Sequence, residues 1–397
     1  MLVLFCWVIA IPPFVALMIF SLETLLGATP LKAKSYPGAM PTTRILIPAH
    51  NEAGTIETTL ARLTSIVADD VRLLVVADNC SDLTAKIVRQ AGHEVIERFD
   101  SDNRGKGFAL AFGIDHLRPN PPACVIIFDA DCESDAASIA ALAKASVAGN
   151  RVVQASYILQ PDLAASPKVQ ISNFAFWIKN VVRQRGGHRL GSAAVLVGTG
   201  MAFPWNVIAN APLATSEIVE DLALSVHLTR SGHPPTYVQH ALVKSVAATE
   251  QATLDQRTRW ETGFLAIARS FGFRALWEGI ATGNRKLFQL GLHLLVPPLA
   301  LLLMLSLTIT VAVGVGASIT GQWGAFIALG LALAVAMAAV LINWMIAGRS
   351  WLGVQALLSL PLYLLWKIPV YLGIVKREEV VWKRTERASN LLEDRAE

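Results

Sequence analysis

Three long apolar runs constrain the fold of this chain more than any other feature. The first covers residues 2–28 and contains one acid, Glu23; the others cover roughly residues 288–316 and 323–347. A helix of about 20 apolar residues is long enough to cross the hydrocarbon layer of a bilayer. Each run therefore predicts a membrane-spanning helix, and the short polar turn between the last two predicts a helix hairpin.

Composition supports a chain that lies partly in lipid. Of the 397 residues, 53% are hydrophobic and 16% are charged, whereas soluble globular proteins carry about 25% charged residues. The net charge of +4 is small and the basic residues form no long run, so no nucleic-acid partner is expected. The apolar runs hold almost no ionisable groups, which argues against a transporter.

Basic residues beside the apolar runs predict the orientation of the chain. Lys32, Lys34 and Arg44 follow the first run, and Arg285 and Lys286 precede the hairpin. Because positively charged flanks stay in the cytosol, the N-terminus is expected outside and the middle of the chain inside. No basic region precedes the first run, so it predicts an anchor rather than a cleaved signal. The expected location is the inner (plasma) membrane, as a multi-pass protein.

A fourth apolar segment, residues 351–375, leaves two interpretations open. It contains Pro361, Lys367 and Pro369 and is followed by a basic tail. A fourth span would place that tail outside, so a segment that lies in the cytoplasmic interface is favoured. The expected organisation is an anchor at 1–30, a cytosolic domain at 33–285, a hairpin at 288–347, this segment at 351–375 and a cytosolic tail at 376–397.

The polar middle of the chain predicts an α/β fold. Short apolar runs at 44–49, 72–77 and 124–128 are typical of strands, and helix-period segments lie around 52–67, 82–91 and 106–117. This alternation indicates a mostly parallel sheet with helices on both faces, which binds ligands at the carboxyl ends of its strands. The four cysteines form no C-x-x-C pair, which fits a reducing, cytosol-facing compartment. The phosphate loops of dinucleotide-binding proteins and P-loop nucleotidases are absent from the sequence.

Polar residues follow the predicted strands directly. Asp129 and Asp131 come after the third strand, and two carboxylates one residue apart can both bind one hard cation such as Mg²⁺ or Mn²⁺ on a diphosphate. Lys106 opens a predicted helix, where main-chain N–H groups form a natural anion site. Each feature also has a plain alternative: a loop turn for the acids, and a solvated lysine in a glycine-rich loop.

Three further segments carry similar ambiguity. Asp78 follows the second strand and can accept a hydrogen bond from a nucleobase or cap a helix. Glu220 and Asp221 precede an apolar-periodic segment, where a carboxylate is ordinarily a helix cap. The sequence QRTRW at 256–260 offers a guanidinium for phosphate and an indole face for a sugar ring, or forms an amphipathic interfacial helix.

The order of these motifs resembles that of the membrane-bound family-2 glycosyltransferases, the group of cellulose, chitin and hyaluronan synthases and many exopolysaccharide transferases. The matching segments are PAHNEA, ADNCSD, NRGKG, DAD, VED and QRTRW, over about residues 40–285. The resemblance implies a GT-A-type (Rossmann-like) domain that transfers a sugar with inversion, with a UDP-sugar as the expected donor. It also implies Mg²⁺ or Mn²⁺ as cofactor, a membrane-associated glycan or lipid-linked acceptor, and a role in cell-surface or extracellular polysaccharide biosynthesis.

The resemblance also assigns roles to individual residues. Asp129 and Asp131 would hold the metal, and Asp221 would be the general base. The donor would be bound by Pro48, His50, Glu52, Asp78, Lys106 and Asp129. The acceptor and pyrophosphate side would be lined by Gly198, Thr199, Gly200, Glu220, Gln256, Arg259 and Trp260.

The sequence departs from the family pattern at two places. Ala77 precedes Asp78 where many members have two acids, which puts part of the uridine binding in doubt. Val219 precedes Glu220 and Asp221 where threonine is commoner, which leaves the hydrogen bonding on the acceptor side open.

Three functions remain open from the sequence. The first is a non-processive or short-chain transferase, and the second is a processive synthase that also extrudes its polymer. QRTRW favours the second by resemblance, whereas three spans can hardly enclose a channel as wide as a polymer. The third is a catalytically silent, nucleotide-binding membrane scaffold, which predicts loss of acidic motif residues that are all present. A homo-oligomer or a polysaccharide-export partner is compatible with each of these three functions.

Overall fold

The computed structural model describes residues 1–215, 217, 219–246 and 250–375. Contacts divide the chain into two compact units. We call residues 30–160 and 192–252 the sheet unit, and residues 1–29, 161–191 and 253–375 the helical unit. The sequence predicted one domain over 33–285, whereas 161–191 and 253–285 group with the predicted spans.

The sheet unit is built on eight strands in the order β3-β2-β1-β4-β7-β6-β8-β5. The strands are β1 (Thr43–Ala49), β2 (Val71–Asp78), β3 (Glu94–Arg98), β4 (Cys124–Ile127), β5 (Cys132–Ser134), β6 (Val153–Leu159), β7 (Met201–Pro204) and β8 (Thr236–Ser245). Strands β1 to β4 pair in parallel, as do β6 and β8, and β7 runs antiparallel to both β4 and β6. Strand β5 pairs antiparallel with β8. The predicted α/β fold is confirmed, with a mixed sheet whose β1 to β4 part is parallel.

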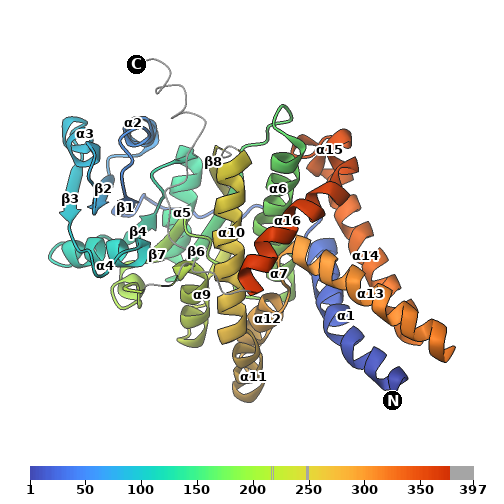
Figure 1. The fold of residues 1–397 in the computed structure, drawn as a ribbon. Coiled ribbons are helices and arrows are strands. Elements are labelled where there is room, and N and C mark those ends of the chain that lie inside the picture. The colour runs from blue at the N-terminus through green and yellow to red at the C-terminus, as the bar shows by residue number, and fades with distance from the viewer. Residues whose placement is uncertain (216, 218, 247–249, 376–397) are drawn as a thin grey trace. The chain divides into compact units, whose positions relative to one another are not determined.

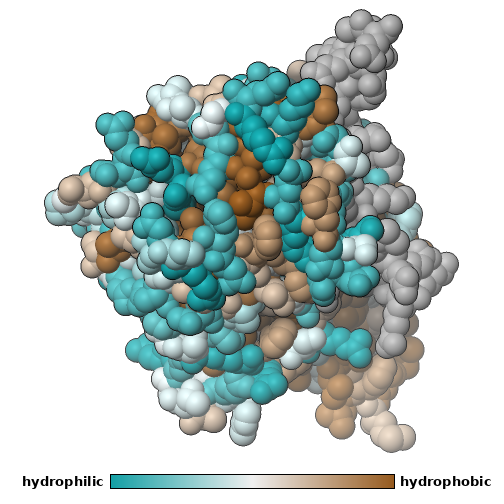
Figure 2. All heavy atoms as spheres, turned by 90° about the vertical axis from the view of Figure 1, so that its left-hand side faces the viewer, coloured by the Kyte–Doolittle hydropathy of each residue, from teal (hydrophilic) through white to brown (hydrophobic). Residues whose placement is uncertain are grey.

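Helices α2, α3 and α4 correspond to the helical segments predicted at 52–67, 82–91 and 106–117, and further helices follow later strands (Figure 1). These helices are α2 (Ile56–Ile66), α3 (Thr84–Gln90), α4 (Lys106–Leu117), α5 (Ala136–Ala148), α8 (Trp205–Ile208) and α9 (Glu220–Arg230). Helix α4 packs closely on the sheet, because a Cβ on Gly113 would lie 2.6 Å from a methyl carbon of Leu46 in β1. Figure 2 shows the side of the sheet unit on which α3 and β3 lie, and most residues on this face are hydrophilic.

Three helices in the described part of the chain are long and apolar enough to cross a membrane. They are α1 (Leu2–Leu26), α13 (Leu299–Thr320) and α14 (Gly324–Ile346), and α1 packs against the other two. The remaining helices of this unit are α6 (Pro167–Trp177), η1 (Ile178–Val182), α7 (Arg183–Leu190), α10 (Glu250–Ile267), η2 (Ala268–Gly272), α11 (Phe273–Thr282), α12 (Arg285–Leu294), η3 (Gly348–Ser350), α15 (Val354–Leu358) and α16 (Leu360–Val375).

The one acid of the first apolar run is buried in a charged cluster of the helical unit. A carboxylate oxygen of Glu23 lies 2.6 Å from the guanidinium of Arg183, and the other lies 2.9 Å from Nδ1 of His293. A charge in an apolar helix is tolerated when it is paired inside the protein. Glu23 therefore ties α1 to α7 and α12.

The predicted span at 288–316 is not one helix. Helix α12 ends at Leu294 and α13 begins at Leu299. Pro297 and Pro298 lie between them, and proline cannot donate the main-chain hydrogen bonds of a continuous helix. The span therefore begins at Leu299, directly after Pro298, and α12 is a separate helix.

The segment predicted at 351–375 forms two helices, α15 and α16. Helix α16 has 16 residues, which rise about 24 Å, less than the roughly 30 Å of a hydrocarbon core. The basic tail predicted at 376–397 lies outside the described residues.

Candidate active site

The loops after β1 and β2 are bonded to each other. Nδ1 of His50 donates to the main-chain oxygen of Asp78 at 2.7 Å, and the amide of Ser81 donates to Oδ1 of Asn51 at 2.8 Å. Asn51 adopts a left-handed φ of 54°, a conformation that asparagine tolerates better than most residues. These contacts fix the two loops as one wall of the site.

Two predicted donor residues, Pro48 and Glu52, shape the first of these loops. Pro48 lies in β1, beyond the last residue that β4 pairs with this strand, so the missing N–H leaves no gap in the ladder. The amide of Glu52 donates to Oγ1 of Thr84 at 2.8 Å, and its carboxylate accepts from Oγ1 of Thr55 at 2.7 Å. Glu52 thus joins the starts of α2 and α3.

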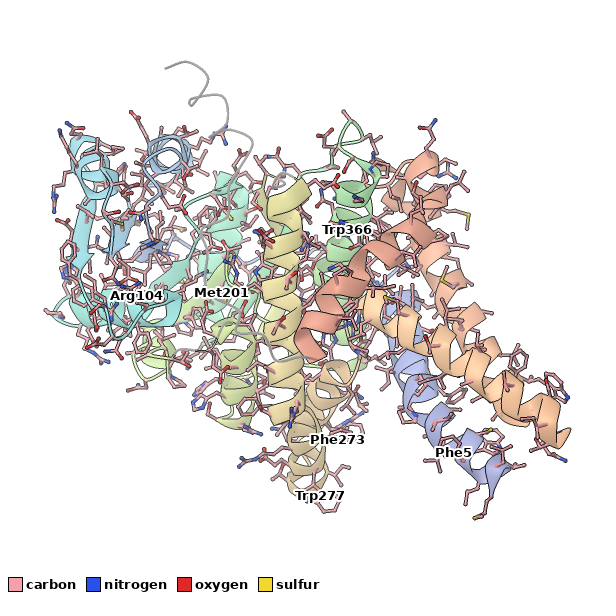
Figure 3. All side chains as sticks on the ribbon, in the orientation of Figure 1. Phe5, Arg104, Met201, Phe273, Trp277 and Trp366 are labelled. Atoms are coloured by element: carbon pink, nitrogen blue, oxygen red, sulfur yellow. The ribbon has the colours of Figure 1, made fainter. Side chains whose placement is uncertain are left out.

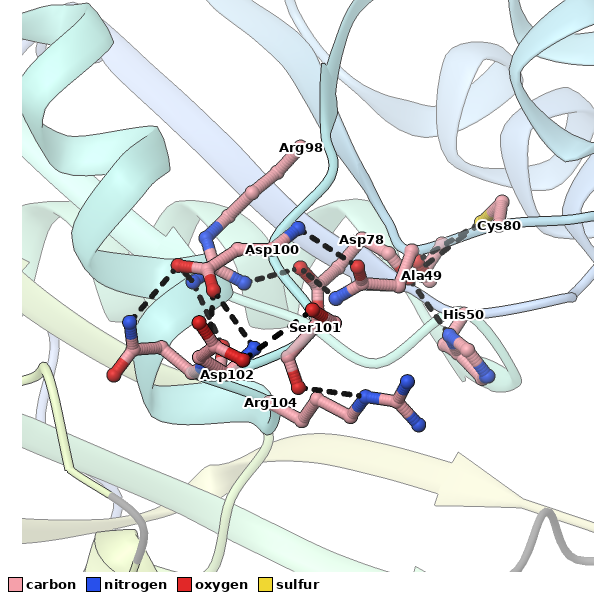
Figure 4. A network of polar contacts seen from close by, with 11 residues as sticks. Ala49, His50, Asp78, Cys80, Arg98, Asp100, Ser101, Asp102 and Arg104 are labelled. Atoms are coloured by element: carbon pink, nitrogen blue, oxygen red, sulfur yellow. Dashed lines mark hydrogen bonds and ion pairs between the residues drawn. The ribbon is translucent and has the colours of Figure 1, made fainter.

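Asp78 is held by an arginine that the sequence analysis did not single out (Figure 4). Arg98, at the end of β3, donates to Oδ1 of Asp78 at 2.7 Å, to Oδ2 of Asp100 at 2.8 Å and to the main-chain oxygen of Asn103 at 2.7 Å. Both Arg98 and Asp78 are buried. Arg98 therefore links the end of β2 to the loop that leads into α4.

Lys106 stands at the start of α4, after Gly105, whose φ of 125° favours glycine. Its ammonium forms an ion pair with Asp129 and donates to the main-chain oxygen of Gly198 at 2.8 Å. Burial alone would lower the pKa of this lysine, but the negative charges of Asp129, Glu220 and Asp221 outweigh it and raise the pKa. The predicted contact between Lys106 and a diphosphate is thus prepared by a fixed positive charge.

The glycine-rich loop at 198–200 joins the two sides of the site. Gly198 has a φ of 87°, and a Cβ there would lie 3.3 Å from both Nζ of Lys106 and Oδ2 of Asp221. Thr199 is buried, and its Oγ1 accepts from the amide of Asp129 at 3.1 Å. Gly200, with a φ of 63°, leaves no room for a side chain beside Val243. The absence of a side chain at 198 leaves room for Lys106 and Asp221, and its absence at 200 lets the loop pack against the sheet.

The two carboxylate oxygens of Asp221 have different surroundings. Helix α9 begins at Glu220, and the amide of Leu222 donates to Oδ1 of Asp221 at 2.7 Å, so one carboxylate oxygen serves the helix start. Oδ2 lies beside Gly198. Burial, together with the negative charge of Asp221, raises the pKa of Glu220 to about 8. A second negative charge beside that of Asp221 is therefore disfavoured.

Asp129 and Asp131 form the only group in the described chain that could hold a metal, together with Cys132. Their ligand atoms all lie within 4.8 Å of one another. Burial raises the pKa of the Cys132 thiol well above its usual range, so this sulfur is not a thiolate at neutral pH. Two carboxylates without a thiolate are the ligand type of hard cations such as Mg²⁺ and Mn²⁺. The residues present fit the predicted ion.

Gln256, Arg259 and Trp260 lie on α10, in the helical unit. The Trp260 ring stacks on Phe176, with centroids 5.5 Å apart. The guanidinium of Arg257, a residue that the sequence analysis passed over, lies 4.6 Å from the Phe176 centroid and 4.8 Å from that of Trp260. Trp260 also lines a cavity of about 110 Å³ within this unit. Trp260 and Arg257 thus contribute to the packing of the helical unit and line this cavity.

Two family models match this chain. The model described as glycosyl transferase family 2 matches residues 44–203, and that described as glycosyl transferase family group 2 matches residues 169–368, half of the chain. No protein of curated function matches the sequence.

The solved structures that this chain matches include a mannosyltransferase and a glucosyl-3-phosphoglycerate synthase. A mannosyltransferase, PcManGT, from Pyrobaculum calidifontis in complex with GDP-Man and Mn²⁺ is 18% identical, with a TM-score of 0.56 over 94% of this chain and 100% of that chain. Glucosyl-3-phosphoglycerate synthase from Mycobacterium tuberculosis in complex with Mn²⁺, uridine-diphosphate and glucosyl-3-phosphoglycerate is 16% identical, with a TM-score of 0.39 over 57% of this chain and 88% of that chain. The first similarity supports a shared fold.

Proposed function

This chain belongs to glycosyl transferase family 2, and from that premise we propose that it moves a sugar from a nucleotide-sugar donor to a membrane-held acceptor, with inversion. The observation that carries the proposal is the meeting of Lys106, Asp129 and Asp221 around Gly198. A cation, a metal-binding carboxylate and a carboxylate for the acceptor are the groups that this reaction needs.

Asp129 and Asp131 would hold Mg²⁺ or Mn²⁺, as the carboxylate pair indicates. The bound ion would neutralise negative charge on the diphosphate. The ion pair between Lys106 and Asp129 supports a place for the ammonium beside the diphosphate. Lys106 would stabilise the charge that grows on the departing nucleoside diphosphate.

Asp221 would act as the general base. In the proposed step the acceptor oxygen bonds to the anomeric carbon while the bond from that carbon to the phosphate oxygen breaks. The proton of the acceptor hydroxyl passes to Asp221, and the bonding electrons leave with the diphosphate. One displacement inverts the anomeric centre.

The donor that we propose is a UDP-sugar, bound through Asp78 and the loop around His50. The Arg98 ion pair fixes Asp78 at the end of β2, where ligands of such sheets bind. The fold match to an enzyme in complex with GDP-Man makes a GDP-sugar the donor to test against it.

The acceptor that we propose is a glycan or a lipid-linked sugar at the membrane, in the synthesis of cell-surface or extracellular polysaccharide. Three helices of the described chain have the length and apolar character of spans. We favour single or short additions over processive synthesis, because three spans enclose no channel as wide as a polymer.

The test uses the purified full chain in detergent, with UDP- and GDP-sugars and a lipid extract as acceptor. Release of nucleoside diphosphate should require Mg²⁺ or Mn²⁺, stop in EDTA and return when metal is added back. Asp129→Asn should abolish release, whereas Asp115→Asn, at an exposed ion pair on α4, should not. Full release in EDTA would refute the metal assignment, and no release from any donor would refute the proposed activity.

A further inference from the structure

The two carboxylate oxygens of Asp78 differ in what they have left to offer a ligand. Oδ1 accepts from a guanidinium nitrogen of Arg98 at 2.7 Å and from Nδ2 of Asn79 at 3.1 Å. A carboxylate has about four lone-pair sites on its two oxygens, so two donors fill one oxygen. Among the described residues, none donates a hydrogen bond to Oδ2 of Asp78. A ligand therefore meets Asp78 as an acceptor with one oxygen, Oδ2.

Asn79 cannot turn its NH₂ group away from Asp78. The side-chain oxygen of Asn79 accepts from the main-chain amide of Asp100 at 2.9 Å. Because that oxygen is bound to an N–H group, the NH₂ group must be the end that faces Asp78. The main chain is fixed as well, since the amide of Asn79 donates to the main-chain oxygen of Arg98 at 2.7 Å. The donation from Asn79 to Oδ1 is thus set by the fold of the loop.

Arg98 is held in place at both ends of its guanidinium. The nitrogen that does not contact Asp78 donates to Oδ2 of Asp100 at 2.8 Å and to the main-chain oxygen of Asn103 at 2.7 Å. The guanidinium also lies over the ring of Phe108 in α4, 5.6 Å from its centroid. A planar guanidinium with donors committed at both ends cannot rotate without breaking several bonds. Arg98 therefore keeps Oδ1 of Asp78 filled.

The loop between β3 and α4 supports this arrangement from within. Oδ1 of Asp100 accepts from the main-chain amides of Asp102 at 3.0 Å and Asn103 at 2.9 Å. Arg104, labelled in Figure 3 near α4, donates to the main-chain oxygen of Ser101 at 3.1 Å. These bonds form inside the loop and need no ligand, so the guanidinium is in place before a donor binds. Such preorganisation favours one ligand geometry over others.

Nucleobases differ in the hydrogen-bonding groups on their Watson–Crick edges, by which proteins recognise them. Uracil presents a single N–H, on N3, between two carbonyl oxygens. Guanine presents N1–H and an adjacent NH₂ group, which together match a carboxylate with both oxygens available. An acceptor with one oxygen satisfies the N3–H of uracil but leaves one donor of guanine unsatisfied, which costs affinity.

From these contacts we propose that Arg98 determines the nucleobase specificity of the donor site: by filling Oδ1 of Asp78, it makes this carboxylate select uracil over guanine. The inference rests on the proposed binding of the nucleobase at Asp78. Arg98 acts through Asp78 and is therefore a positioning residue. The ligands selected are uridine diphosphate and its sugars, and thymine, which carries the same N3–H between two carbonyl oxygens, fits the same acceptor.

The test compares the affinities of UDP, CDP, GDP and inorganic pyrophosphate for the purified full chain in detergent with Mn²⁺, by isothermal titration. Pyrophosphate reports the diphosphate side alone. UDP should bind the wild type at least about tenfold more tightly than GDP, because an unsatisfied donor costs about that factor or more. Equal affinities of UDP and GDP would overturn the inference and leave the proposed sugar transfer standing. If none of the four ligands binds, the proposed function fails together with the inference.

Asp78→Asn should change which base is preferred. Arg98 and Asn79 both donate toward the position of Oδ1, so they hold the new amide oxygen there and turn its NH₂ group to the position of Oδ2. That group donates, and it matches the acceptor N3 of cytosine rather than the N3–H of uracil. CDP should therefore bind this variant more tightly than UDP, with the affinity for pyrophosphate unchanged. A variant that still prefers UDP to CDP would overturn the proposal.

Arg98→Met tests the arginine itself, and Arg44→Met is its matched control. Arg44 lies in the same sheet and forms an ion pair with Glu94 at 2.7 Å. Loss of the guanidinium frees a lone pair on Oδ1 of Asp78, so the ratio of UDP to GDP affinity should fall toward one in Arg98→Met and stay at the wild-type value in Arg44→Met. The ratio cancels effects on the diphosphate, which both nucleotides share.

Equal ratios in the two variants would show that Arg98 has a structural role only, which overturns the proposal. If Arg98→Met does not fold, the preference of Asp78→Asn decides, because that variant keeps an oxygen partner for Arg98.

Discussion

At the scale of single residues, the side chains at the strand ends hold one another in place. Arg98 bonds Asp78, Asp100 and Asn103 together, and Lys106 bonds Asp129 to the Gly198 loop. A site whose charges are fixed beforehand spends little free energy on reorganisation during the reaction.

Removal of Arg98 should leave Asp78 as a buried carboxylate without its cation. Loss of one partner of a buried ion pair costs about 3–5 kcal/mol of stability, so Arg98→Ala should lower the free energy of unfolding by that order. Arg118→Ala breaks an exposed pair with Asp115 and should cost at most about 1 kcal/mol. Denaturant unfolding of the full chain in detergent measures both. Equal small losses would show that the Arg98 pair contributes nothing.

The raised pKa of Glu220 predicts a pH dependence of donor binding. Glu220 is protonated below its pKa of about 8 and becomes negative as the pH rises through that value. Its charge then lies near Lys106 and Asp129 and repels a diphosphate. The affinity for UDP should therefore fall between about pH 7 and pH 9 in the wild type.

Glu220→Gln should remove this alkaline loss, because glutamine does not ionise. Glu217→Gln changes a nearby exposed acid, and its affinity for UDP should still fall at alkaline pH. Isothermal titration across the pH range checks both variants. If the affinity of Glu220→Gln for UDP falls with pH as it does in the wild type, another group is responsible for the titration.

The sequence pointed to more of the residues that line the candidate site than of the residues that hold them in place. Asp129, Asp131 and Lys106 follow strands or open helices, and the structure brings them together where the sequence placed them. Arg98 and Arg257 were missed because nothing in their local sequence shows burial or a distant partner. Each acquires its role only from a neighbour brought close by folding, such as Asp78 or Phe176.

At the scale of helices and strands, apolar pattern predicted the central strands and little beyond them. Strands β1, β2 and β4 are continuous apolar runs and were recognised. Strand β7 has four residues and β8 shifts register against β6 between Ala155 and Ser156, so neither gives a clear periodic signal. Pro297 and Pro298 end a run that hydropathy alone treats as continuous, because hydropathy does not register a missing N–H.

The α11–α12 hairpin should depend on glycine at its closest approach. Gly279→Ala places a Cβ 2.4 Å from the Phe288 nitrogen, so the helices must separate and the thermal midpoint should fall. Gly330→Ala on α14 meets no atom within 4 Å and should be neutral or stabilising, since alanine favours helix over glycine by about 1 kcal/mol. Thermal unfolding of both variants in detergent measures the two midpoints. An unchanged midpoint in Gly279→Ala would contradict the close contact.

At the scale of the whole molecule, the chain passes repeatedly between its two compact units. Segment 161–191 leaves the sheet unit for the helical unit, and the chain returns at 192 before leaving again at 253. The domain predicted over 33–285 is a continuous stretch of sequence, whereas membership of a compact unit depends on contacts between segments far apart in the chain. The spans themselves were recognisable, since length and apolar character are local properties.

The positive-inside rule predicts the topology of the full chain. A green fluorescent reporter inserted after Arg349 should fluoresce in the cytosol, because α13 and α14 form a hairpin whose basic ends stay inside. A tag on the N-terminus should be accessible from outside the inner membrane. An alkaline phosphatase fusion after Arg349 that is active would contradict this orientation.

The central claim is that this chain transfers a sugar through a base at Asp221, and one variant tests it most directly. Asp221→Asn keeps the shape of the side chain and an acceptor oxygen for the start of α9, but it cannot take a proton. It should bind UDP with near wild-type affinity while turnover falls roughly 10²–10⁴-fold. Turnover at the normal rate would reduce Asp221 to a helix cap, and loss of UDP binding together with turnover would assign it to the donor site or the fold.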